Sequence, residues 1–290
     1  MRGADAHVVA DDGERIRVWV SGEGPPMVLL HEWASSHAIW ESLVGGLDGH
    51  FTVYRWDARG HGGHAGSGAE LPSVGRMAGD LAGLIKHFDM VRPVVVGHSM
   101  GALTLWEYIG RYGCAGLSGI CIVDQSPRVV TDDQWSLGIY GDWPTERDAA
   151  FVADLEADFV ETVIGLISFG KNRRARERYE TGSSSVQRLR NYLQGLDPRP
   201  LIAIWKSLAA ADYRPVLPSI DVPALLVYGT ESNYYGVETG EYVQRNIPDA
   251  RLVVYEGADH SPHIARPQRF VTDLLRFATE GGDVSATAAP

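Results

Sequence analysis

One five-residue run, Gly97 to Gly101, has the G-x-S-x-G pattern and places Ser99 at its centre, where the hydroxyl could act as a nucleophile. The pattern alone is a weak signal, because glycine makes up 33 of the 290 residues. Its setting is specific: a β-branched run at 94–96 precedes it and an amphipathic segment follows it. That order predicts a strand, a strained turn that the glycines permit, and a helix whose N-terminus favours negative charge nearby.

A serine hydroxyl needs a base to become a nucleophile, and His260 is the expected base. It ends the run Gly257 to His260, which lies between the last predicted strand and the last predicted helix. A loop in that position lies at the carboxyl edge of a parallel sheet, where open α/β sheets build their sites. His263 competes for the role, but a place at the pocket rim or in the structure is expected for it. Ser99 and His260 together predict acyl-transfer chemistry.

Short apolar runs alternate with longer helical patterns, which predicts a mostly parallel sheet with helices on both faces. Residues 7–10 and 16–20 flank an Asp-Asp-Gly turn and predict an opening hairpin. Six further buried strands are predicted at 27–30, 51–56, 94–96, 120–123, 224–228 and 251–255. Helices are predicted at 74–88, 102–112 and 269–278. The expected sheet therefore has eight strands.

Residues 131–214 depart from this alternation of strands and helices, because they contain helical patterns and no convincing strand. Helices are predicted there at 148–167, 173–179, 185–193 and 200–209. We expect this segment to form a helical lid over a core made of residues 1–130 and 215–280. The Gly/Ala/Ser-rich tail at 281–290 is expected to be frayed.

Composition excludes several function classes. The net charge of −11 argues against nucleic acid as a partner, and no apolar stretch is long enough to span a membrane. The N-terminus lacks the apolar core of a signal peptide, and the two cysteines, Cys114 and Cys121, lack metal-type spacing, so a cytoplasmic protein is expected. Without a nucleotide loop, metal cluster or haem signature, we expect a small-molecule substrate, no cofactor and no metal. The oligomeric state stays open.

Five landmarks follow one another in an order that resembles the α/β-hydrolase fold family, of the type of esterases, cofactor-free haloperoxidases and meta-cleavage-product hydrolases. They are His31-Glu32-Trp33, the run D-A-R-G-H-G at 57–62, the Ser99 run, Gly229 and His260. The resemblance implies an α/β-hydrolase sheet with a helical lid. It also implies an oxyanion hole made by the backbone N–H groups of Trp33 and Met100, a type of site that stabilises a tetrahedral intermediate.

Glu32 is the first departure from that family, which usually has glycine after the histidine. A carboxylate is thereby placed near the expected oxyanion hole. We expect Glu32 to point away from the hole in a structural role. The alternatives are that it tunes the polarity of the site or binds a group of the substrate, and no catalytic role is expected for it.

The carboxylate that orients the histidine is the second departure. The family usually has aspartate three residues after the glycine that ends the strand before the histidine loop, and here Ser232 stands there. Glu231 lies one position earlier, and Asp124 directly follows the predicted strand at 120–123. Either could orient the imidazole and stabilise its charged form, and Asp124 is favoured. Its alternative role is to cap a turn.

Aromatic side chains are dense in the predicted lid, and with Trp33 they indicate an aromatic, mainly apolar pocket. The candidate pocket residues are His31, Glu32, His98, Trp135, Tyr140, Trp143 and His263. A medium-sized apolar or aromatic ester, lactone or vinylogous diketone would suit such a pocket.

Three functions from different classes are compatible with these residues. The favoured one is a serine hydrolase with Ser99 as nucleophile and His260 as base. The second is a cofactor-independent dioxygenase, or a lyase or cyclase, in which a His260–Asp124 dyad deprotonates the substrate. The third is a non-catalytic ligand receptor, against which the intact Ser99 and His260 argue.

Overall fold

The structure, a computed structural model, describes residues 4–63 and 71–280 of the chain, so the tail at 281–290 lies outside the described residues. Eight strands form one sheet in the order β1-β2-β4-β3-β5-β6-β7-β8. Their bounds are Ala4–Val9 (β1), Arg15–Ser21 (β2), Pro26–Leu30 (β3), Thr52–Asp57 (β4), Val94–His98 (β5), Gly119–Val123 (β6), Ala224–Gly229 (β7) and Ala250–Tyr255 (β8). The predicted eight-stranded sheet is therefore confirmed.

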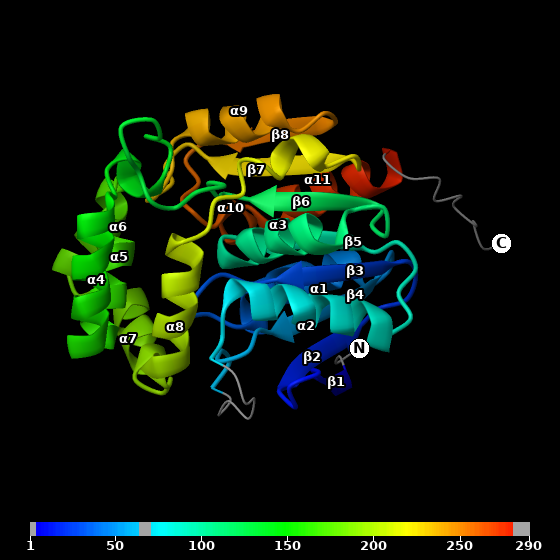
Figure 1. Cartoon of the computed structure of the whole chain (residues 1–290), viewed down its shortest axis with the longest axis horizontal. Coiled ribbons are helices and arrows are strands. Elements are labelled where there is room, and N and C mark those ends of the chain that lie inside the picture. Colours follow the sequence, from blue (N-terminus) through cyan, green and yellow to red (C-terminus); the bar gives the residue numbers. More distant parts are fainter. Residues whose placement is uncertain (1–3, 64–70, 281–290) are drawn as a thin grey trace.

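Most of the sheet is parallel, and the strands at its centre are buried. The hairpin β1–β2 and the pair β2–β4 are antiparallel, and every pair from β4 through β3 to β8 is parallel. The central strands β5, β6 and β7 are buried at every residue, whereas β2 mixes buried positions with partly or fully exposed ones. A strand that is buried on both faces needs helices on both sides of the sheet, and Figure 1 shows them there.

Helices of the core pack on the two faces of the sheet. Their bounds are Glu41–Leu47 (α1), Val74–His87 (α2), Met100–Tyr112 (α3), Val237–Asn246 (α9), Pro262–Ala265 (α10) and Pro267–Glu280 (α11), with short 3₁₀ turns at His37–Trp40, Ile139–Gly141 and Leu217–Ser219. Buried side chains of α2, α3 and α9 belong to one hydrophobic cluster, and those of α1 and α11 belong to a second cluster on the other face. The predicted helices on both faces are thus present.

Three of these helices, α1, α9 and α10, have no counterpart among the sequence predictions. The reason is local: α1 contains two glycines in seven residues, α10 has four residues, and α9 buries only Thr239, Gly240 and Val243. None of them carries the long apolar stripe on which a prediction from periodicity depends. Their helical state comes from packing against neighbouring elements.

Five helices are inserted between β6 and β7, and Figure 1 shows α4 to α7 grouped beyond the carboxyl ends of these strands. They are Thr145–Ala157 (α4), Phe159–Ser168 (α5), Arg173–Glu180 (α6), Ser184–Leu193 (α7) and Pro198–Ala209 (α8). The single helix predicted at 148–167 is wrong, because the chain breaks at Asp158. That residue leaves helical geometry, and its side chain accepts a hydrogen bond from the N–H of Glu161, which caps the start of α5.

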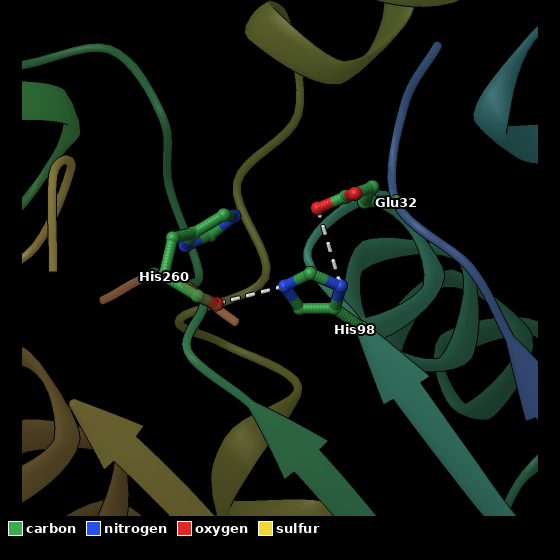
Figure 2. A group of neighbouring side chains, drawn as sticks. All are labelled: Glu32, His98 and His260. Atoms are coloured by element: carbon green, nitrogen blue, oxygen red, sulfur yellow. Dashed lines mark hydrogen bonds and ion pairs between the residues drawn. The ribbon is translucent and has the colours of Figure 1, made fainter. Parts of the chain in front are cut away.

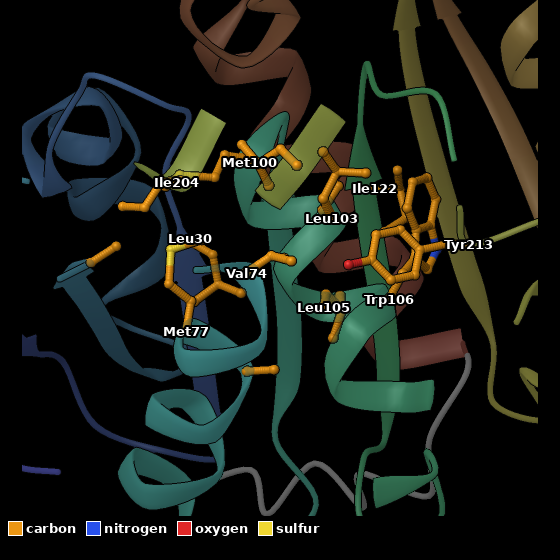
Figure 3. Close-up of a cluster of buried hydrophobic side chains, with 14 of the residues drawn as sticks. Leu30, Val74, Met77, Met100, Leu103, Leu105, Trp106, Ile122, Ile204 and Tyr213 are labelled. Atoms are coloured by element: carbon orange, nitrogen blue, oxygen red, sulfur yellow. The ribbon is translucent and has the colours of Figure 1, made fainter. Parts of the chain in front are cut away.

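Helix α3 is packed tightly under the turn that starts it. Figure 3 shows Met100, Leu103 and Trp106 of α3 among buried side chains of the sheet and of α8. A Cβ atom added at Gly101 would overlap the carbonyl oxygen of Leu30, and one added at Gly97 would lie 2.6 Å from the backbone nitrogen of Ala102. Glycine is therefore required for the close approach of α3 to β3 and for the sharpness of the turn.

Two glycine-to-alanine substitutions in helices test this packing. Gly101→Ala should lower the free energy of unfolding by about 1–3 kcal/mol, because the new methyl group must displace the β3 backbone. Gly83→Ala in α2 has open space at its Cβ position and should raise the free energy of unfolding by about 0.5–1 kcal/mol. Urea denaturation of both variants measures the contrast. Equal effects in the two variants would show that the approach to Leu30 is not tight.

Candidate active site

Ser99 lies at the junction of β5 and α3, in a backbone conformation that few residues adopt. Its φ of 53° and ψ of −116° fall outside the regions that are favourable for a residue with a side chain. The surrounding backbone holds this geometry: Ser99 donates its N–H to Val123, and its carbonyl accepts from the N–H groups of Ala102 and Leu103. The strained turn presents the side chain of Ser99 to a cavity at the carboxyl edge of the sheet.

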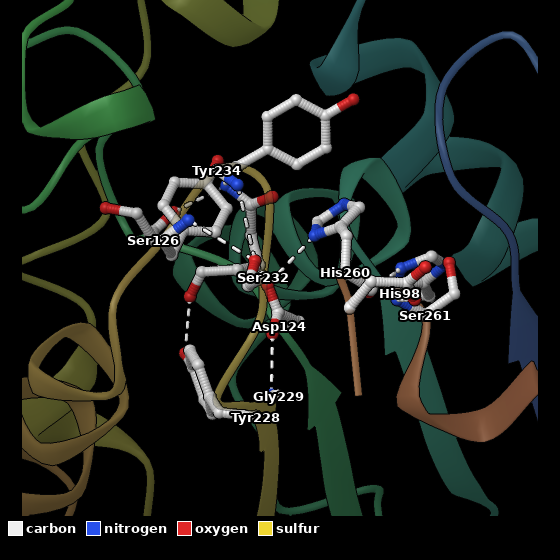
Figure 4. Close-up of polar contacts among 12 residues, drawn as sticks. His98, Asp124, Ser126, Tyr228, Gly229, Ser232, Tyr234, His260 and Ser261 are labelled. Carbon is white, nitrogen blue, oxygen red and sulfur yellow. Dashed lines mark hydrogen bonds and ion pairs between the residues drawn. The ribbon is translucent and has the colours of Figure 1, made fainter. Parts of the chain in front are cut away.

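His260 is paired with Asp124 beneath the same cavity (Figure 4). The Nδ1 atom of His260 lies 2.9 Å from Oδ1 of Asp124, whose side chain is completely buried. Asp124 directly follows β6, and its positive φ of 46° turns the chain at the strand end. Because Nδ1 donates to the carboxylate, Nε2 of His260 is left with a lone pair that can accept a proton.

Ser232, which stands where related chains usually have the acid, donates its hydroxyl to Oδ1 of Asp124 at 2.6 Å. The backbone N–H of Gly229 donates to Oδ2 at 2.9 Å. Burial raises the pKa of Asp124, and these two donors oppose that shift by stabilising the carboxylate. Of the two carboxylates considered from the sequence, the structure brings Asp124 to the histidine and leaves Glu231 exposed; among the described residues, the hydrogen bonds of Glu231 are made by its backbone.

Among the described residues, no hydrogen bond joins the hydroxyl of Ser99 to the imidazole of His260. Both residues line the same cavity, and the ring of Tyr234 packs edge-on against that of His260 with centroids 4.4 Å apart. Hydrogen bonds between catalytic groups are often long without substrate and tighten in the complex. The arrangement therefore places the two side chains together without the bond that acyl transfer would need.

The backbone N–H groups of Trp33 and Met100 are available at the cavity. Both residues line it, and in the part of the chain that the structure describes neither N–H donates to a protein acceptor. Trp33 is held in place by the inserted helices: its indole N–H donates to the carbonyl of Leu201 at 2.9 Å, and its ring packs against Trp205 with centroids 5.0 Å apart. Two unpaired donors that face one cavity can hold an oxyanion.

Glu32 turns its carboxylate toward His98 (Figure 2). Its Oε2 atom lies 3.3 Å from Nδ1 of His98, and Glu32 also lines the cavity. Burial raises the pKa of Glu32 to about 7, and the nearby charge of Asp259 adds to that rise. Burial lowers the pKa of His98 well below its usual range, so its ring stays neutral at pH 7, where about half of the Glu32 side chains are ionised.

The cavity has a volume of about 340 Å³ and lies between the sheet edge and the inserted helices. Its apolar walls come from both parts and include Leu103, Val129, Ile139, Val163, Leu166, Leu189, Trp205 and Leu208. Polar groups project into it at a few points, among them Gln125, Asn172, Arg178, Tyr192, Asn233, Tyr234 and Tyr235. An apolar cavity with few polar groups suits a small organic ligand.

The three aromatic residues expected in the pocket lie elsewhere. Trp135 donates its indole N–H to the carbonyl of Arg128 and packs against Tyr242, so it joins the insertion to α9. Tyr140 and Trp143 line a second hollow beside α4 and α5. The expectation for these three residues was wrong, because a high number of aromatic residues in a segment does not indicate which side of its helices faces the sheet. Trp205 lines the cavity instead.

Three histidines expected at the pocket lie behind its wall. His31 accepts the N–H of Ala58 at Nε2, and its Nδ1 contacts the carbonyl of Glu32, so both ring nitrogens are used by the backbone. His98 and His263 are fully buried, and their rings pack against each other with centroids 4.6 Å apart. Of the seven residues expected to line the pocket, only Glu32 does so.

Tyr234 and Tyr235 are cavity residues that sequence reasoning missed. They follow Ser232 in the loop after β7 and lie beside His260. Their position in the sequence could have predicted this, because they directly follow the place where the acid was expected. A loop that brings an acid to the histidine also brings the residues that follow the acid.

Glu32, His98 and His260 are also the residues of this site that could hold a metal ion. One ligand atom from each lies within 4.8 Å of the others. Separately, no helix among the described residues is long and apolar enough to cross a membrane.

Comparison with known proteins finds relatives along almost the whole chain. The model of the alpha/beta hydrolase family matches residues 27–274. A pimeloyl-[acyl-carrier protein] methyl ester esterase of Vibrio vulnificus is 27% identical over 267 residues, which are 89% of this chain and 95% of that protein. The 3-oxoadipate enol-lactonase 1 of Acinetobacter baylyi is 23% identical over 269 residues, which are 91% of this chain and 93% of that protein.

Among solved structures, an esterase from Exiguobacterium antarcticum has the same fold. The TM-score is 0.81 at 23% sequence identity, and the match covers 95% of this chain and 100% of the esterase.

The buried histidines of this region make stability depend on pH, and His61 provides the test. Burial lowers its pKa from 6.5 to about 3, and the neighbouring His31 adds to the shift. Below pH 6.5 the unfolded chain therefore takes up a proton that the folded chain refuses, so the free energy of unfolding falls as pH drops. At pH 5 the loss from this one residue is about 2 kcal/mol.

His61→Asn should remove that loss, so the difference in unfolding free energy between pH 7 and pH 5 should shrink by about 2 kcal/mol. His50→Asn is the control, because His50 is exposed. Urea denaturation at the two pH values measures both variants. The same pH dependence in His61→Asn as in the wild type would contradict the assignment.

Proposed function

The chain belongs to the alpha/beta hydrolase family, and from this premise we propose that it hydrolyses a carboxylic ester or lactone through an acyl-enzyme on Ser99. The observation that carries the proposal is the His260–Asp124 pair, with Nδ1 and Oδ1 2.9 Å apart, at the cavity that the strained Ser99 also lines. An oriented imidazole beside a partly exposed serine is the combination that activates a hydroxyl nucleophile.

In the proposed reaction, Oγ of Ser99 attacks the carbonyl carbon while Nε2 of His260 takes the hydroxyl proton. The oxygen of the tetrahedral intermediate is held by the N–H groups of Trp33 and Met100. The imidazolium returns its proton to the leaving alkoxide, which departs as the alcohol. Water then attacks the acyl-enzyme with His260 as base and releases the acid. Asp124 stabilises the imidazolium throughout.

The shape and lining of the cavity support a substrate of medium size and mainly apolar or aromatic character. A volume of about 340 Å³ is at the lower end for small-molecule sites, and its walls are mostly aliphatic and aromatic. Relatives whose names specify a methyl ester and an enol-lactone support this reaction class. The helices at 131–214 would act as the lid that closes over such a substrate. We place the enzyme in the cytoplasm, consistent with two free cysteines.

A second candidate function is proton abstraction by the His260–Asp124 dyad without attack by Ser99, as in a cofactor-independent dioxygenase, lyase or cyclase. One observation favours it: the dyad is fully formed, whereas the described contacts of Ser99 include no bond to the imidazole. In that reaction Ser99 would only donate a hydrogen bond to the substrate. Oxygen uptake with aromatic substrates, independent of Ser99, would identify the dioxygenase.

Replacement of the nucleophile tests the acyl-enzyme. Ser99→Ala should reduce turnover of short-chain p-nitrophenyl esters by about 1,000-fold or more, because it removes the hydroxyl that forms the proposed covalent intermediate. The assay contains a chelator. Ser42→Ala, at an exposed serine of α1, is the control and should keep full activity. Ester turnover that survives in Ser99→Ala would overturn the acyl-enzyme.

The assignment of the acid has its own test. Asp124→Asn should lower kcat/KM by about 10³–10⁴-fold, because the imidazole loses the charge that orients and stabilises it. Glu231→Gln should stay close to wild type, since that side chain is exposed and lies away from the hydrogen bonds that hold His260. Thermal unfolding of both variants checks that they fold. A larger loss in Glu231→Gln than in Asp124→Asn would reverse the assignment.

A further inference from the structure

We propose that Glu32, His98 and His260 form a binding site for Zn²⁺, and that the bound ion inhibits the enzyme reversibly. Metal binding stands on geometry alone, whereas inhibition rests on the proposed function, in which His260 is the base. Figure 2 shows that the three side chains converge from three segments: the loop after β3, the end of β5 and the loop after β8.

His98 is the most informative ligand, because one of its nitrogens makes no hydrogen bond to any residue that the structure describes. Its Nε2 lies 2.9 Å from the carbonyl oxygen of His260. A carbonyl only accepts, so Nε2 carries the hydrogen and Nδ1 presents a lone pair. The residue is completely buried, and its Nδ1 makes no hydrogen bond. A buried acceptor without a donor costs free energy, and here it faces the carboxylate of Glu32 at 3.3 Å.

His260 offers its second nitrogen to the same point. Asp124 holds Nδ1, which leaves Nε2 as the atom free to bind a ligand. Histidines that bind metals usually donate their other ring N–H to a carboxylate or a backbone carbonyl, which orients the ring. His260 has the carboxylate of Asp124 and His98 has the carbonyl of His260, so both rings already have the partners of metal-binding histidines.

The distances fit a small tetrahedral ion after a modest adjustment. Zinc binds nitrogen and carboxylate oxygen at about 2.0–2.1 Å, so two ligands of one tetrahedral site lie about 3.3 Å apart. Glu32 and His98 are already separated by 3.3 Å. The three ligand atoms lie within 4.8 Å of one another, so the remaining approach is at most about 1.5 Å.

The donor set and its surroundings select the kind of ion. Two imidazoles and one carboxylate suit Zn²⁺, whereas Mg²⁺ and Ca²⁺ prefer oxygen ligands. Glu32 and His260 line the cavity, so a fourth position would open toward it and take water. A zinc ion there would occupy the lone pair of Nε2 of His260, and that nitrogen could no longer take the proton of Ser99.

Zinc binding to the purified, chelator-treated protein tests the site. Competition with a chromophoric chelator should give one Zn²⁺ per chain, and Co²⁺ should give the visible absorption of a four-coordinate site. Glu32→Gln and His98→Asn should each weaken zinc binding by about 100-fold, since loss of even an outer partner of a metal ligand costs 10–100-fold. His50→Asn is the control: His50 is exposed, and this variant should bind zinc as the wild type does.

Ester hydrolysis is followed in the same zinc titration. It should fall over the concentrations at which zinc binds, and EDTA should restore it. No saturable binding, or binding that Glu32→Gln leaves unchanged, would overturn the site. Because Glu32 is partly exposed and glutamine has its size, this variant decides the question even if His98→Asn fails to fold.

The two claims can fail separately. Zinc that binds through Glu32 without slowing turnover would overturn inhibition and the role of His260 as base, while the metal site would stand. If no ester is hydrolysed at all, the binding measurements still decide the metal site.

Discussion

The buried carboxylate of Asp124 is the interaction on which the rest of the site depends. Its two oxygens accept hydrogen bonds from His260, Ser232 and Gly229, which belong to the loop after β8, the loop after β7 and the end of β7. A carboxylate that is completely buried is unfavourable unless such donors surround it. The three donors therefore hold the carboxylate, and the carboxylate in turn holds three segments at one point of the sheet edge.

Ser232 stabilises an acid that lies at the end of a neighbouring strand. The family resemblance places the acid after the strand that corresponds to β7, whereas here a serine stands there and donates to an acid that follows β6. The two strands are neighbours in the sheet, so side chains at their carboxyl ends reach the same histidine nitrogen. An acid at the end of β6 therefore orients His260, and the hydroxyl of Ser232 donates to that acid.

Neutral histidines lie behind the wall of the cavity, and their burial makes the fold sensitive to acid. Burial depresses the pKa of His31, His98 and His263, so these rings remain uncharged as the pH falls. They give the site hydrogen-bonding atoms without adding positive charge beneath Ser99. As a consequence, the fold loses stability in acid, because the unfolded chain gains protons that the folded chain does not. The Nδ1 lone pair of His98, the proposed zinc ligand, belongs to one of these neutral rings.

Much of this protein was determined by local sequence. All eight strands, the turn at Ser99 and the helix after it follow from apolar runs and glycine spacing, because buried strands and tight turns depend on residues close together in the chain. The order of landmarks placed Ser99 and His260 at one sheet edge. Tertiary structure decided what depends on distant residues: Asp124 rather than Glu231 beside His260, Glu32 turned toward His98, and Tyr140 and Trp143 away from the cavity. Those outcomes depend on how strands, loops and inserted helices pack in space. A local sequence pattern does not contain that information, because the residues in contact are far apart in the chain.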